Sequence, residues 1–152
     1  MTTTHPAFLE PLVGSWTIHA SINGTPTGDG TTTFEWMPGT GLLVQRSEST
    51  PDASTPPEWI EHSPFPIDAV IGADDTTGEA TMLYSDARGV LRIYDVSLEN
   101  GVWKIWRSAS GMHQRFTGTF SADGRTIESV WEGSPDGLTW THDFETRYER
   151  AD

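Results

Sequence analysis

The sequence contains no cysteine, which excludes a disulfide framework, a zinc–thiolate site and a thiol nucleophile. It is also poor in positive charge, with nine Lys and Arg residues against 22 Asp and Glu and a formal net charge of −13 at pH 7. Such a chain repels phosphate backbones and anionic membrane surfaces. We therefore expect neither a nucleic-acid partner nor a membrane partner.

Long hydrophobic runs are absent as well, so no segment of the sequence is a candidate bilayer span. The start Met1–His5 lacks the basic and apolar parts of a signal peptide. Together with the missing cysteines, this predicts a protein of the reducing cytoplasm. At 152 residues, the chain is most simply one domain, residues 1–152, with one substantial core.

Several sequence motifs of catalysis and cofactor binding are also missing. There is no nucleophile elbow, phosphate-binding loop or dinucleotide fingerprint. Gly28–Gly30 and Gly39–Gly41 lie between predicted strands rather than before helices, so we interpret both as turns. The histidines lack the spacing of zinc ligands, and we expect no metal site.

What the chain does contain is alternation of apolar and polar residues between glycine-rich turns. On Met112–Phe120, for example, Gln114 and Phe116 share one face while His113 and Arg115 share the other. A period of two with one polar face is typical of an antiparallel sheet that is wet on one side. About ten such strands are predicted: Leu12–Ile22, Thr31–Met37, Leu42–Ser49, Ile67–Gly72, Glu79–Ser85, Val90–Leu98, Val102–Arg107, Met112–Phe120, Thr126–Glu132 and Leu138–Tyr148.

Ten up-and-down strands close most economically into a single barrel, because closure removes the exposed edges. We therefore predict an all-β, antiparallel up-and-down barrel with a short N-terminal helical turn at Thr4–Glu10. Phe8, Leu9 and Leu12 are expected to plug one end of it.

Residues 49–66 interrupt the strand pattern with five prolines, so we expect no ordinary strand or helix there. The segment nevertheless carries Trp59, Ile60 and Phe65. Two interpretations remain open: a lid or contact surface, and a surface loop whose apolar residues fold back on the barrel.

Gly14-Ser15-Trp16 matches the Gly-x-Trp signature of the lipocalins and other calycins, which lies on the first strand after a short helix. More narrowly, six segments resemble an uncharacterised family of small bacterial lipocalin-like barrels: Leu12–Trp16, Thr33–Trp36, Gln45–Arg46, Asp86–Val90, Arg115–Phe120 and Trp140–Phe144. Pro11–Trp16 and Gln45–Arg46 are also similar to the nitrobindin haem barrels. The long 49–66 loop departs from the small-barrel family, and the chain lacks the cysteines that staple secreted lipocalins.

Alternation predicts which side chains point into the barrel. If Trp16, Phe116, Trp131 and Phe144 point inward, then so do Gln114 and His142, which lie two residues from an inward neighbour. Polar groups on an apolar face indicate a pocket or an internal network. The predicted ligand-binding set is Trp36, Arg46, Tyr84, Tyr94, Gln114, Phe116, Trp131, His142 and Phe144, with Arg92 joining it if its strand has the phase of Tyr94. The phases of 90–98 and 102–107 stay open.

Three functions fit this set. The first is binding of a small, mainly apolar or aromatic organic ligand, without a cofactor. The second is a cyclase- or isomerase-type enzyme, with His142 as acid or base and Tyr94 or Arg92 stabilising negative charge. The third, implied by the nitrobindin resemblance, is a haem protein with His142 as the axial ligand. Because Trp103 and Trp106 lie on opposite faces of one strand, we also consider a homodimer through the exposed one or through the loop.

Overall fold

The computed structural model describes residues 4–50 and 55–152, so part of the proline-rich segment, residues 51–54, lies outside the described residues. Within these ranges the chain forms ten β-strands: β1 (Gly14–Ile22), β2 (Thr25–Trp36), β3 (Leu43–Thr50), β4 (Ile67–Ala73), β5 (Ala80–Asp86), β6 (Leu91–Glu99), β7 (Val102–Arg107), β8 (His113–Phe120), β9 (Thr126–Ser134) and β10 (Thr141–Arg150). A 3-10 helix, η1 (Ala7–Leu12), precedes them, and a short helix, α1 (Pro57–Glu61), lies between β3 and β4.

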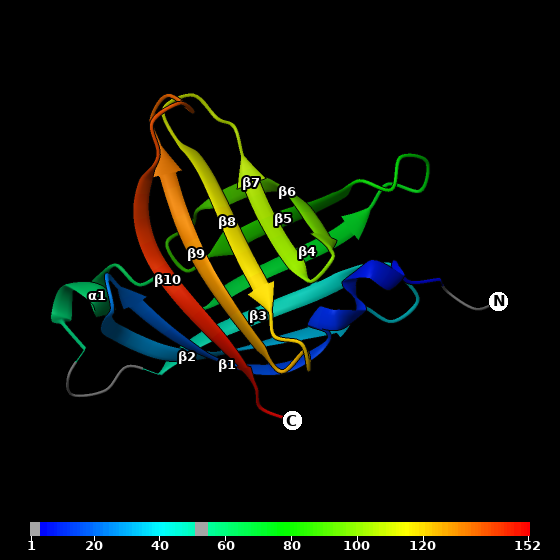
Figure 1. The fold of residues 1–152 in the computed structure, drawn as a ribbon, viewed down its shortest axis with the longest axis horizontal. Helices are drawn as coiled ribbons and strands as arrows, with labels where there is room; N and C mark the ends of the chain where they lie inside the picture. Colours follow the sequence, from blue (N-terminus) through cyan, green and yellow to red (C-terminus); the bar gives the residue numbers. More distant parts are fainter. Residues whose placement is uncertain (1–3, 51–54) are drawn as a thin grey trace.

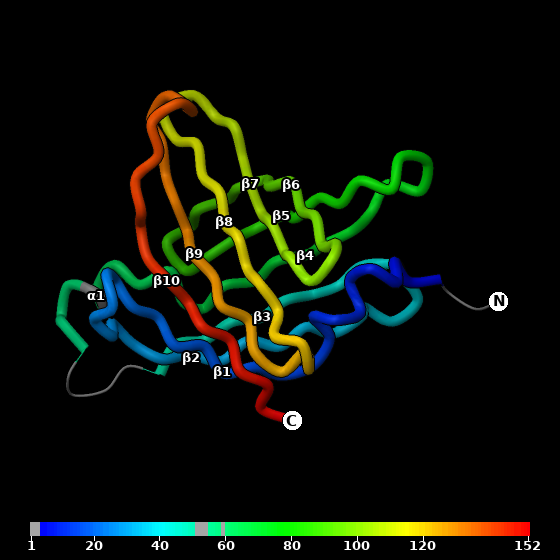
Figure 2. Tube along the Cα trace, viewed as in Figure 1, coloured from blue at the N-terminus to red at the C-terminus, as the bar shows by residue number. Residues whose placement is uncertain are grey.

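Each strand pairs antiparallel with its neighbours in sequence, and β1 also pairs with β10, which closes the sheet into a barrel (Figures 1 and 2). The closing register joins Trp16 to Arg150 and Ser21 to Glu145. The predicted all-β up-and-down barrel is therefore confirmed. Because the strands alternate in direction, two sets of hairpin connections lie at opposite ends, which we call the η1 end and the far end.

The η1 end is closed by the 3-10 helix and filled by large apolar side chains. Leu9 and Leu12 are fully buried against the barrel, as the sequence predicts. Trp16, on β1, is also buried, and its Nε1 donates a hydrogen bond of 2.9 Å to the carbonyl oxygen of Leu12. Phe34, Leu43, Ile71, Trp103 and Ile127 complete this part of the core.

Two local expectations are wrong. The segment 49–66 does contain a helix, α1, because Pro56 is its N-cap and Pro57 its first residue, the positions where a missing N–H costs nothing. Gly28–Gly30 is not a turn but part of β2, whose pairing with β1 shifts register between Ala20 and Ser21. Gly30 permits close strand packing rather than chain reversal, since a Cβ there would lie 2.5 Å from the carbonyl oxygen of Glu48.

Gly30→Ala should therefore destabilise the barrel by at least about 1 kcal/mol, because backbone has to move to admit the methyl group. The matched control is Gly133→Ala on β9, where the nearest atom, the carbonyl oxygen of His113, is at an ordinary 3.8 Å. Urea denaturation of both variants measures the difference. Equal unfolding free energies would contradict this account of Gly30.

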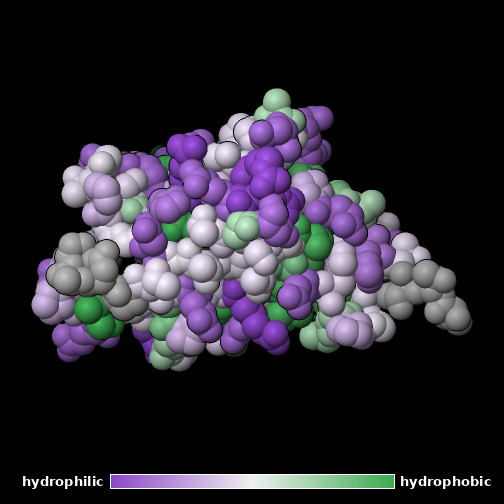
Figure 3. Space-filling model, turned by 90° about the horizontal axis from the view of Figure 1, so that it is seen from below, coloured by the Kyte–Doolittle hydropathy of each residue, from purple (hydrophilic) through white to green (hydrophobic). Residues whose placement is uncertain are grey.

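The outside of the barrel is mostly polar. The face seen in Figure 3 is covered largely by hydrophilic residues, with smaller hydrophobic areas between them. On other strands, however, the outer face exposes Leu91, Ile93 and Trp106. Within the described ranges, no helix has the length and apolar character needed to cross a bilayer.

Candidate functional site

The inner face of the barrel differs between its two ends. Near η1 most of its large side chains are fully buried, with Trp36 and Phe120 half-buried. Toward the far end three inner-face aromatic residues, Tyr84, Trp131 and Phe144, stay partly accessible. They form a chain of ring contacts, with centroids 6.0 Å apart for Tyr84 and Tyr94, 6.0 Å for Tyr94 and Trp131, and 6.4 Å for Trp131 and Phe144. Phe116 packs below Trp131 at 5.1 Å. We call Tyr84, Tyr94, Phe116, Trp131 and Phe144 the aromatic cluster.

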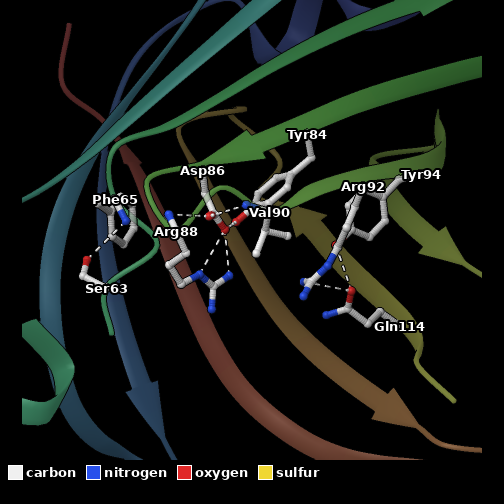
Figure 4. A network of polar contacts seen from close by, with 9 residues as sticks. All are labelled: Ser63, Phe65, Tyr84, Asp86, Arg88, Val90, Arg92, Tyr94 and Gln114. Atoms are coloured by element: carbon white, nitrogen blue, oxygen red, sulfur yellow. Dashed lines mark hydrogen bonds and ion pairs between the residues drawn. The ribbon is translucent and has the colours of Figure 1, made fainter. Parts of the chain in front are cut away.

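Polar groups border this cluster. The Oε1 atom of Gln114 accepts hydrogen bonds from the Tyr94 hydroxyl at 2.8 Å and from Arg92 Nη1 at 3.4 Å (Figure 4). Arg92 lies opposite Tyr84 in the β5–β6 register, so it has the phase of Tyr94. The Arg92 side chain therefore points to the inner face of β6. Leu91 and Ile93 lie on the outer face, where they are 65% and 64% exposed.

A second polar group lies beside the first, at the end of β5. The Asp86 side chain is fully buried and accepts hydrogen bonds from the Tyr84 hydroxyl at 2.7 Å and from Arg88 Nη2 at 2.7 Å. Burial alone would raise the pKa of Asp86, but the bonds from Arg88 and Tyr84 outweigh it and lower that pKa to about 2. Burial and the bond to Asp86 raise the pKa of Tyr84 well above its usual range. At neutral pH this pair is an ionised carboxylate and a neutral phenol.

The end of the proline-rich segment lies against this second group. The backbone N–H of Ala87 donates to the carbonyl oxygen of Pro64 at 3.0 Å. Figure 4 shows the next contact, in which Phe65 N–H donates to Ser63 Oγ at 3.2 Å. Phe65 is half-buried, whereas Ile60 is 52% exposed. The lid role of this segment stays a prediction.

Small hydroxyl and amide side chains complete the polar part of the interior. Thr32 and Ser47 hydrogen-bond to each other at 2.7 Å, and Gln45 Nε2 donates to Thr32 Oγ1 at 3.2 Å. Ser129 Oγ donates to the carbonyl oxygen of Thr146 at 2.7 Å. These groups are satisfied within the protein, so we interpret them as an internal network rather than ligand-binding atoms.

Of the nine predicted site residues, the structure brings together Tyr84, Tyr94, Gln114, Phe116, Trp131 and Phe144. Two others lie elsewhere. Trp36 is near the η1 end, stacked on His5 with ring centroids 4.2 Å apart, and its Nε1 donates to Glu10. Arg46 is on the outer face, where it forms a 3.6 Å ion pair with Asp68.

The predicted inward orientation of His142 is wrong. The β9–β10 register shifts between His142 and Phe144, so that Asp143 is an extra residue in a β-bulge. Because a bulge reverses which face the following residues occupy, Phe144 points inward while His142 lies outside. His142 is exposed, and its Nε2 lies 2.5 Å from the Glu145 carboxylate. Trp140 is displaced with it and lies 4.1 Å from the Arg115 guanidinium.

The residues present do not fit a histidine-ligated haem. The imidazole expected to ligate the iron lies outside the barrel, and the inner face, in the described part of the chain, carries no histidine. We derive no function through haem.

Three residues of this region were missed as site residues. The predicted site contains neither Asp86 nor Arg88, which lie at and just after the end of β5, nor Arg107 at the end of β7. The signal for Arg107 is alternation with Trp103 and Ile105, both of which are buried on the inner face of β7. The sequence alone leaves the phase of 102–107 open, so this signal does not single out Arg107.

Comparison with known proteins supports the fold. No family model matches the sequence, and no curated protein matches it. Among solved structures, the crystal structure of Rv2717c from M. tuberculosis is similar to this chain, with a TM-score of 0.62 and 13% sequence identity over 98% of this chain and 100% of the other. At this identity the likeness shows a shared barrel fold alone.

Proposed function

We propose that this chain is a calycin-like cytoplasmic barrel that binds a small, mainly apolar or aromatic organic molecule at its far end. The ligand would contact the partly accessible rings of the aromatic cluster and be oriented by the Arg92–Tyr94–Gln114 group. The observation that carries the proposal is the surroundings of the half-buried rings at the two ends. Near η1 the half-buried Trp36 and Phe120 pack against His5 and Trp16. At the far end the half-buried Tyr84, Trp131 and Phe144 lie in one cluster beside the Arg92–Tyr94–Gln114 hydrogen bonds.

Physical considerations favour a ligand there. Partly exposed aromatic rings gain free energy when an apolar molecule covers them, and a few placed polar groups fix its orientation. Gln114 suits this role, since its Oε1 is held by two donors from β6.

The enzyme alternative stays a prediction, and no contact in the site favours it. The proposed acid or base, His142, lies outside the barrel. The pKa of Asp86 is lowered and the pKa of Tyr84 is raised, so both lie far from 7. Neither side chain is therefore suited to exchange protons near pH 7. A homodimer through the face of Trp106, which is 38% exposed, likewise stays a prediction.

The test is a fluorescence titration with N-phenyl-1-naphthylamine, a neutral aromatic probe that brightens in apolar surroundings. We expect saturable binding that weakens about tenfold in Phe144→Ala, because the variant removes a ring from the partly accessible wall. Trp36→Ala is the matched control, since Trp36 is also half-buried but lies near the η1 end. Absence of saturable binding, or equal losses in both variants, would contradict the proposal.

A further inference from the structure

A groove of about 340 Å³ opens beside the polar group of the site, between the beginning of β6 and the end of β7. It exists because these two strands pair only from Asp95 opposite Trp106 to Glu99 opposite Val102. The first residues of β6 therefore have no partner on β7. Its lining consists of Leu91, Arg92, Ile93, Asp95, Arg107, Ser108 and Ala109.

Two arginines line this groove, and neither forms an ion pair among the described residues. The arginines that do pair with a carboxylate, such as Arg88 and Arg115, do not line the groove. In a chain with 22 acidic residues and a net charge of −13, two adjacent guanidinium groups without carboxylate partners are unexpected. Asp95 also lines the groove, but it contacts neither arginine within ion-pair distance.

Gln114 connects Arg92 to the aromatic cluster and lies beside Arg107 in the sheet. It is opposite Arg107 in the β7–β8 register, and its Oε1 accepts the bond from Arg92 Nη1. The Tyr94 hydroxyl holds the same oxygen, and the Tyr94 ring belongs to the cluster. A ligand that covers the aromatic rings would thus meet both guanidinium groups at its polar end.

We propose that the ligand of this site is an anion, an aromatic or apolar molecule whose carboxylate or similar anionic oxygen group is bound by Arg92 and Arg107. This rests on the proposed function and specifies its ligand class. Guanidinium groups donate paired hydrogen bonds to such oxygens, and these charge-assisted bonds are roughly twice as strong as neutral ones. The surrounding negative charge of the protein disfavours anions elsewhere on its surface, which concentrates their binding at this groove.

The experiment compares two probes with the same aromatic skeleton: 1-anilinonaphthalene-8-sulfonate, an anion, and the neutral N-phenyl-1-naphthylamine. The wild-type protein should bind the anion more tightly. Arg107→Gln should weaken anion binding about tenfold, the loss of about one charge-assisted bond, and leave the neutral probe nearly unchanged. Arg107→Lys, which keeps the charge, should recover part of the loss. Arg46→Gln removes an outer-face arginine and is the control for non-specific attraction.

The outcomes separate the two proposals. If the neutral probe fails to bind, the proposed function itself is contradicted. If it binds but the anion is not preferred, or if Arg107→Gln and Arg46→Gln weaken the anion equally, only the anion inference is overturned. Thermal melting of each variant shows whether a loss of probe binding comes from unfolding. If Arg107→Gln is unfolded, Arg92→Gln provides the same comparison from the other side of the groove.

Discussion

Trp16→Ala is expected to lower the free energy of unfolding by about 3–5 kcal/mol, the usual cost of removing a large buried aromatic side chain. Trp16 is only 1% exposed and packs edge-on against Phe120 and Tyr148, with centroids 6.3 and 6.4 Å away. The Arg150 guanidinium covers the ring at 4.1 Å. The substitution thus opens a cavity where β1, β10 and η1 meet.

Loss of the indole also removes one of the two hydrogen bonds that hold the end of η1. Trp16 Nε1 donates to the carbonyl oxygen of Leu12, and Arg150 Nη2 donates to that of Pro11 at 2.7 Å. Trp16→Phe keeps most of the packing but not this bond, and we expect an intermediate loss. Trp36→Ala, in a half-buried and partly solvated position, should cost much less. Urea denaturation orders the three variants, and a Trp36→Ala loss as large as that of Trp16→Ala would contradict the closed-end role.

Asp86→Asn should remove a pH-dependent part of the stability worth about 2–3 kcal/mol near neutral pH. The pKa of Asp86 is lowered from 3.8 to about 2 in the folded protein. A carboxyl group with a lowered folded pKa stabilises the folded state above its unfolded pKa. This contribution is lost as the pH falls from about 4 to about 2, because the folded protein must then take up the proton.

The measurement is the unfolding free energy of the wild-type protein and of Asp86→Asn across this pH range. The gap between them should be largest above pH 5 and shrink toward pH 2, whereas the other carboxylates affect both proteins alike. A gap that stays constant with pH would show that Asp86 does not gain its stability from ionisation. Asp136→Asn, at an exposed turn, is the control for a carboxylate with backbone partners.

These results would assign different tasks to the two ends of the barrel. The η1 end is closed by packing and gives stability. The far end keeps aromatic rings partly accessible, and it holds ionised Asp86 and the Arg92–Gln114 pair where a fully packed core would have apolar side chains. Asp86 is well paired and adds to stability, whereas Arg92 and Arg107 form no ion pair among the described residues, which fits a binding region.

The architecture follows from patterns that are visible in the sequence alone. Alternation on strands such as Met112–Phe120, with glycine turns between them, predicts the antiparallel barrel, because side chains of a half-wet strand must repeat every two residues. The same alternation placed Gln114, Phe116 and Trp131 inside, since no irregularity interrupts β8 or the β8–β9 register. The plug by Leu9 and Leu12 followed from their position before the first strand.

The phase of individual strands and the contacts between polar groups depend instead on how the strands pair in three dimensions. One extra residue at Asp143 turned His142 outward, and a bulge leaves no mark in a pattern of alternating residues. On β6, hydrophobicity favours burying Leu91 and Ile93, yet pairing with β5 and β7 points Arg92 and Tyr94 inward. Asp86 and Arg88 contact each other and Tyr84 locally, but only the fold brings Pro64 against Ala87 and Gln114 opposite Arg107. A site assembled by closing a barrel depends on these registers, and local sequence does not encode them.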